Sequence, residues 1–165
     1  MRRVLLEAWP ALLEEVETTL DCVLFFDAPR AIGFAHAQTH GAIFLRVSDL
    51  ERTGRLIEEL VHEASHVRLD AIMMATPLLD LHDKARYSTP LRREPRTAFG
   101  LFHQLFVLRR IVDLHRRVTA LFDTEERVRA CDQFAQAWDT AQTLNLTISG
   151  NSLLGTMRMT TDAPR

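Results

Sequence analysis

Two histidines four residues apart are the side chains in this sequence best suited to chemistry. They belong to the pentapeptide HEASH at residues 62–66. Residues four apart in an α-helix lie one turn apart on the same face, so both imidazoles can reach a single metal ion. Glu63 between them can act as general base towards a metal-bound water, orient a ligand, or contact substrate. The pattern predicts a metal centre built on a helix.

The segment that carries HEASH has the composition of a buried helix. Residues 56–75 contain no Gly and no Pro. Apolar side chains recur at helical spacing, and His62 and His66 lie beside that stripe on a face shared with Leu69 and Met73. We therefore expect this helix to be covered on two sides, at the centre of the core.

A third protein ligand is needed, because two imidazoles alone bind a metal weakly. His103 is the strongest candidate, since it interrupts the apolar stripe of a second predicted helix at about 98–118. The simpler alternative is a core histidine hydrogen-bonded to a backbone carbonyl. Glu94 is a poorer candidate in a proline-flanked loop, and His36 and His40 are reserve ligands beside a predicted hairpin.

Asp70 lies one further turn along the same helix. A rise of 1.5 Å per residue puts it about 12 Å from His62 along the axis, too far for both to bind one ion. Asp70 is either an acceptor for a ligand imidazole or, as the sequence favours, a solvated charge. His82 and His115 lie in or beside polar sequence, so we expect both at the surface.

A basic segment precedes the His103 helix. Residues 84–96 carry five positive charges and one negative charge, and two prolines stiffen the chain there. An arginine held in place can bind a carboxylate with two parallel hydrogen bonds, so the segment is either an anion clamp or a solvated basic loop. Arg110, on the same helical face as His103, is a second candidate for binding a carboxylate, or for an internal salt bridge.

Three blocks of this sequence resemble one enzyme family, in the order in which that family has them. They are HEASHVRL, YSTPLRREPRT and GLFHQLFV, which together cover about residues 56–110. They resemble the HExxH-type peptide β-hydroxylases, which depend on iron(II) and 2-oxoglutarate and modify ribosomally made peptides. Leu91, Glu94 and Thr97 depart from the Trp, Asp and Pro of that family, whereas its two arginines are retained.

The resemblance implies Fe(II) at His62, His66 and His103, with the cosubstrate 2-oxoglutarate held by Arg92 and Arg96. It implies hydroxylation of an unactivated carbon, expected to be the β-carbon, of a residue in a peptide or of a free or carrier-bound amino acid in natural-product biosynthesis. One alternative is a zinc metallopeptidase or other zinc hydrolase that uses the same histidines with Glu63 as base. Another is a noncatalytic helical module in which the histidines are incidental.

The composition limits the class of protein. A chain of 165 residues, 47% hydrophobic, fits one compact domain over residues 1–165, with a tail that frays from about residue 160. A net charge of −2 argues against a nucleic-acid partner. No apolar run approaches 18 residues and no signal peptide is recognisable, so we expect no membrane partner and a cytoplasmic location. Cys22 and Cys131 are expected to be buried free thiols, and a homodimer remains open.

We predict an α+β fold, mainly helical, with a small N-terminal antiparallel sheet packed on the HExxH helix. Too few strands are predicted for the double-stranded β-helix that is usual for this cofactor class. The expected elements are a helix over 4–20 that Pro10 kinks or splits, a strand at 23–26, a hairpin of 32–37 and 42–47, a cap at 48–49, an irregular span over 76–97, a helix over 124–143 and an irregular tail from 145.

Overall fold

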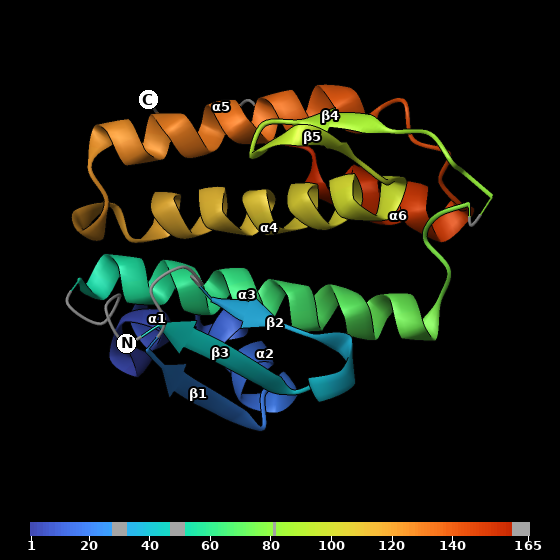
Figure 1. Ribbon diagram of the computed structural model, residues 1–165. Coiled ribbons are helices and arrows are strands. Elements are labelled where there is room, and N and C mark those ends of the chain that lie inside the picture. The colour runs from blue at the N-terminus through green and yellow to red at the C-terminus, as the bar shows by residue number, and fades with distance from the viewer. Residues whose placement is uncertain (28–32, 47–51, 81, 160–165) are drawn as a thin grey trace.

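The computed structural model describes residues 1–27, 33–46, 52–80 and 82–159. Six α-helices, five strands and two short 3-10 helices follow one another in these ranges (Figure 1). They are α1 (Arg2–Ala8), α2 (Pro10–Thr19), β1 (Cys22–Phe26), β2 (Phe34–Ala35), η1 (Ala37–Thr39), β3 (Ala42–Arg46), α3 (Thr53–Ala75), β4 (Tyr87–Thr89), β5 (Arg92–Arg96), α4 (Ala98–Arg117), η3 (Thr119–Leu121), α5 (Thr124–Ala141) and α6 (Ile148–Met157).

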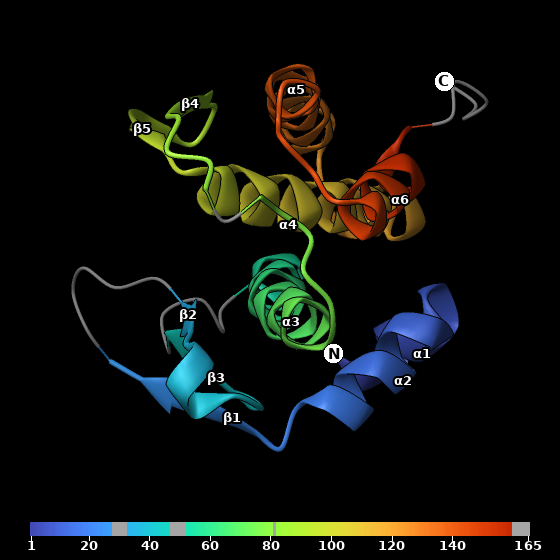
Figure 2. The same cartoon turned by 90° about the vertical axis from the view of Figure 1, so that its right-hand side faces the viewer.

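Helix α3, which carries HEASH, runs through the middle of the molecule. Figure 2 looks along it and shows α4 on one side, with the sheet and the α1–α2 pair on the other. Ile57, Val61 and Ala64 of its apolar stripe are fully buried, whereas Met74 near the end of the helix is 79% exposed. The expected central position of this helix is therefore confirmed. Apolar side chains on two faces of a helix need a covering layer on each side.

The N-terminal sheet has three strands in the order β1-β3-β2. Strand β2 pairs with β3 in the antiparallel sense, as the hairpin prediction requires. Strand β1 pairs with β3 in the parallel sense, so the sheet is mixed and the prediction of an antiparallel sheet was wrong for β1. Alternate residues Ile43 and Leu45 of β3 are buried, and this face packs on α3. The mainly helical α+β fold is confirmed.

The chain from 4 to 20 forms two helices, α1 and α2, which meet at Trp9. Pro10 occupies the first turn of α2, where its missing N–H leaves no hydrogen bond unmade. The split at Pro10 was one of the two expected outcomes. Leu12, Leu13 and Val16 are the buried residues of α2.

Two segments expected to be irregular contain regular structure. A two-stranded hairpin, β4–β5, occupies residues 87–96, and helix α6 lies in the tail. Helix α4 begins at the side-chain cap Thr97, and α5 begins with a capping box from Asp123 and Glu126. The predicted cap at 48–49 and the frayed end at 160–165 lie outside the described residues.

Both cysteines are free, but Cys22 is exposed and Cys131 is half-buried, so their expected burial was wrong. In the described ranges, no helix combines the length and the apolar character needed to cross a membrane. One hydrophobic cluster includes residues from α1 to α6.

Candidate metal centre

His66 on α3 and His103 on α4 face each other where the two central helices meet. Their Nδ1 atoms are 3.2 Å apart, and the rings are nearly parallel, with centroids 5.5 Å apart. Metal–nitrogen bonds of about 2.0–2.1 Å place two neighbouring imidazole donors about 3.0–3.4 Å apart. The separation of these two atoms therefore fits a pair of ligands on one ion.

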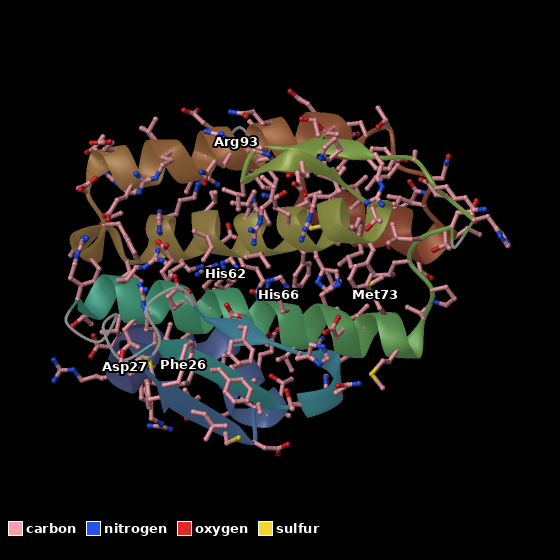
Figure 3. The ribbon with its side chains drawn as sticks, in the orientation of Figure 1. Phe26, Asp27, His62, His66, Met73 and Arg93 are labelled. Atoms are coloured by element: carbon pink, nitrogen blue, oxygen red, sulfur yellow. The ribbon has the colours of Figure 1, made fainter. Side chains whose placement is uncertain are left out.

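His62 lies one turn before His66 on the same side of α3, and Figure 3 shows both side chains between α3 and α4. The His62 and His66 ring centroids are 5.1 Å apart and the ring planes differ by 60°. Within the described part of the chain, no three His, Cys, Asp or Glu side chains are arranged as a ready ligand set. Of the three predicted ligands, His66 and His103 thus have facing nitrogen atoms, whereas His62 lies beside His66 without completing a ligand set among these residues.

Burial keeps all three imidazoles neutral. Desolvation, with repulsion from His66 as a smaller cause, lowers the pKa of His62 to about 4 and that of His103 to about 3. Desolvation also lowers the pKa of His66. A neutral imidazole keeps one nitrogen lone pair, which is what a metal ligand requires.

Phe99 and Gly100 shape the start of α4 beside His103. The Phe99 ring lies 4.1 Å from the His103 ring and is 49% exposed. A side chain on Gly100 would meet Arg96 at 3.2 Å from Cβ and 3.3 Å from Nε. The Arg96 side chain therefore lies across the first turn of α4, and it would have to shift by a few tenths of an ångström to admit a side chain at position 100.

The two predicted cosubstrate arginines occupy different ends of β5. Arg92 pairs with Thr89 next to the hairpin turn, whereas Arg96 pairs with Tyr87 next to α4. The register shifts between these two pairs, because two residues of β4 span the same length as four residues of β5, so β5 bulges between the two arginines. Both are exposed, and Arg96 is the one that lies beside the helix of His103.

Arg110 has a carboxylate partner within the protein. Its guanidinium donates two hydrogen bonds to Glu15 of α2, at 2.5 and 3.2 Å. Arg68 of α3 lies 3.6 Å from the same carboxylate. Of the two roles considered for Arg110, the internal salt bridge is the one observed, so it is not available to bind 2-oxoglutarate.

Replacing Arg110 with alanine is expected to destabilise the protein by roughly 1–3 kcal/mol, because Glu15 would lose a two-point, charge-assisted partner in a half-buried site. Denaturant unfolding measures this loss. The affinity for 2-oxoglutarate, measured by calorimetry on the folded variant, should stay within about twofold of the native value. A tenfold fall would return Arg110 to the cosubstrate site.

Glu63 is turned towards the sheet. Its side chain, 4% exposed, accepts a hydrogen bond from the Ala35 N–H, and a side chain on Gly33 would come within 2.9 Å of its Oε1. Burial, followed by repulsion from Glu59, raises the pKa of Glu63 to about 8. The described contacts of this carboxyl are with β2 and its flank, and no contact with the histidines is found among the described residues.

In metal-free protein, this buried carboxyl predicts a loss of stability as the pH rises. Its pKa is about 8 in the folded state and near 4.5 in the unfolded chain, so its favourable contribution is complete below pH 4.5 and disappears by pH 8. Glu63→Gln, which cannot ionise, should become more stable than the native protein by roughly 2–5 kcal/mol across that interval. Chelator-treated samples unfolded in urea at pH 4.5 and pH 8 measure it. A constant difference would contradict the prediction.

His115 was expected at the surface and is instead buried. Its Nε2 lies 2.6 Å from Glu58 Oε2, and its ring stacks on Phe122. Arg55 and His115 both contact Glu58. Burial raises the pKa of Glu58, but these two contacts outweigh that effect, so the pKa is lowered overall. By contrast, His36, His40 and His82 are exposed.

No family model matches the chain, and no curated protein is detectably similar to it. The resemblance to the HExxH-type β-hydroxylases therefore depends on the three blocks of residues alone.

Proposed function

We propose that this protein is a non-haem iron(II)- and 2-oxoglutarate-dependent dioxygenase. Its substrate is a residue of a peptide, or a free or carrier-bound amino acid, hydroxylated at an unactivated carbon. The observation that carries the proposal is the convergence of the Nδ1 atoms of His66 and His103, which come from different helices. Two facing imidazole nitrogens from different helices are expected at a metal centre. A HExxH sequence that arose by chance would not require a histidine opposite it on another helix.

The residues present fit a bound metal ion. Nδ1 of the buried His103 and Nδ1 of His66 face each other at a separation that two ligands of one ion would have, and a buried imidazole needs such a polar partner. Three histidines would leave coordination positions open for a cosubstrate. Iron(II) with 2-oxoglutarate and dioxygen would supply an oxidant able to take hydrogen from an unactivated carbon, with succinate and carbon dioxide as coproducts.

Arg96 supports 2-oxoglutarate as the cosubstrate. Its side chain lies across Gly100, less than one turn from His103 along α4. A guanidinium there can bind the distal carboxylate of a short dicarboxylic acid whose other end lies at the metal. The half-exposed Phe99 ring covers one side of His103 and offers an apolar surface to a substrate carbon chain.

The position of Glu63 favours this reaction over zinc-dependent hydrolysis. A hydrolase of the HExxH type needs that carboxylate beside the metal-bound water as general base. Here the carboxyl accepts a hydrogen bond from β2 and is enclosed by Gly33. In the proposed enzyme Glu63 would join the metal helix to the sheet, without handling a proton.

Anaerobic reconstitution tests the proposal. Adding Fe(II) and then 2-oxoglutarate should produce a weak visible charge-transfer band, and admitting oxygen should yield succinate. A protein that binds zinc, stays colourless with Fe(II) and 2-oxoglutarate, and hydrolyses peptides would instead be a hydrolase. Retention of no metal at all would indicate the helical module. A mass-spectrometric screen of amino acids and peptides for a gain of one oxygen would then identify the substrate.

A further inference from the structure

A carboxylate lies at the ring nitrogen of His103 that does not face His66. Asp70 Oδ1 is 3.4 Å from His103 Nε2, while His103 Nδ1 is 3.2 Å from His66 Nδ1. The Asp70 side chain is 20% exposed, so it is not the solvated charge that the sequence favoured. The contact is within ion-pair distance but is not aligned as a hydrogen bond, since Nε2 has no such partner among the described residues.

Helical spacing on α3 explains how one ring can contact both side chains. His66 and Asp70 are four residues apart on α3, so they lie on one face, one turn apart. The His103 ring from α4 lies against both side chains, with one nitrogen towards each. One imidazole thereby links the second histidine of HEASH to the acid of the next turn.

This placement selects one tautomer of His103. A neutral imidazole has one N–H and one lone pair. A lone pair on Nε2 would face the carboxylate oxygen and be repelled, whereas an N–H there is attracted. The proton therefore belongs on Nε2, which leaves the lone pair on Nδ1, directed towards His66.

We propose that Asp70 is a positioning residue that holds His103 in its Nε2–H tautomer, so that the cation is bound through Nδ1 of His103 beside Nδ1 of His66. This inference rests on the metal site of the proposed function and not on its oxygen chemistry. A carboxylate behind a ligand imidazole fixes the ring and raises its basicity, and removing such a partner costs about 10–100-fold in metal affinity.

The tautomer can be measured directly in the metal-free native protein. Long-range ¹H–¹⁵N spectra separate protonated from unprotonated ring nitrogens, and the signals of residue 103 are those that disappear in His103→Gln. We expect a protonated Nε2 and an unprotonated Nδ1. A proton on Nδ1 of His103 in the native protein would overturn the inference, without any variant of Asp70.

Asp70→Ala tests the consequence for the metal. We expect His103 to become a mixture of tautomers and the affinity for Co²⁺, followed by its visible absorption, to fall about 10–100-fold. Asp70→Asn, which keeps an acceptor oxygen, should recover part of both properties. The matched control is Asp113→Ala, since Asp113 is a similarly buried acid, 23% exposed, whose partner is Arg109 on α4. It should leave both properties unchanged.

Native Co²⁺ affinity in Asp70→Ala, or an unchanged tautomer in that variant, would overturn the inference. Failure of the proposed function is distinguishable. A protein that binds Co²⁺ through this site but never converts 2-oxoglutarate would remove the dioxygenase proposal and leave the role of Asp70 intact.

Discussion

His103→Gln is expected to weaken Co²⁺ binding by more than about 100-fold. The side chain supplies one of the two nitrogen atoms that already face each other across α3 and α4. Loss of a ligand should exceed the loss of about 10–100-fold that follows removal of a residue behind a ligand. Glutamine keeps much of the volume at this buried position, which limits the cavity left in the helix interface. Absorbance titration with Co²⁺, in competition with a chelator, measures the change.

His66→Gln should behave in the same way, and His62→Gln tests whether the third ring turns to join the pair. His82→Ala is the control, because His82 is exposed and lies outside the helices. Circular dichroism should show native helix content in all four variants. If His103→Gln bound Co²⁺ as tightly as the native protein, the ion would not be held between α3 and α4.

The second large effect concerns the cosubstrate. Arg96→Ala should raise the dissociation constant for 2-oxoglutarate by about 10–100-fold, since a charge-assisted hydrogen-bonded contact is worth about 1.5–3 kcal/mol. Binding of Fe(II) itself should not change, because Arg96 supplies no ligand. Titration of the visible band with 2-oxoglutarate under anaerobic conditions measures the first quantity, and competition with a chelator measures Fe(II) binding.

Two further variants separate the position of Arg96 from its charge. Gly100→Ala keeps the arginine but places a methyl group 3.2–3.3 Å from its side chain, so 2-oxoglutarate affinity should fall while the helix is not weakened. Arg93→Ala removes a neighbouring charge of the same hairpin, from a position between Arg92 and Arg96. In Figure 3, Arg93 and the two histidines of HEASH lie on opposite sides of α4. Equal losses in Arg93→Ala and Arg96→Ala would mean that only the net charge of the hairpin matters.

The helix that carries HEASH was predictable because its signals are local. Apolar spacing from Leu56 onwards fixes which face of α3 is buried, and the same period places His62 and His66 on one side. The apolar stripe interrupted by His103 likewise located a buried polar group on α4. Pro10 marked the break between α1 and α2 because proline is favoured in a first helical turn.

Contacts between distant elements were harder to predict. The parallel pairing of β1 with β3 depends on how the chain returns to the sheet, and five apolar residues cannot encode it. His115 appeared to be a surface residue because its sequence neighbours are charged, yet Glu58 of α3 lies opposite it. Arg110 satisfied the helical criterion for the site, but its partner is Glu15, which lies 95 residues away in sequence.

By itself, the sequence determined which side chains share a helical face, since the 3.6-residue period is a property of each helix alone. Only the tertiary structure decided which faces meet. The antiparallel crossing of α3 and α4 placed His103 against His66 and Asp70, Gly100 admitted the side chain of Arg96, and β2 received Glu63. These contacts depend on the alignment and rotation of packed elements, which result from packing over the whole core and not from any single segment.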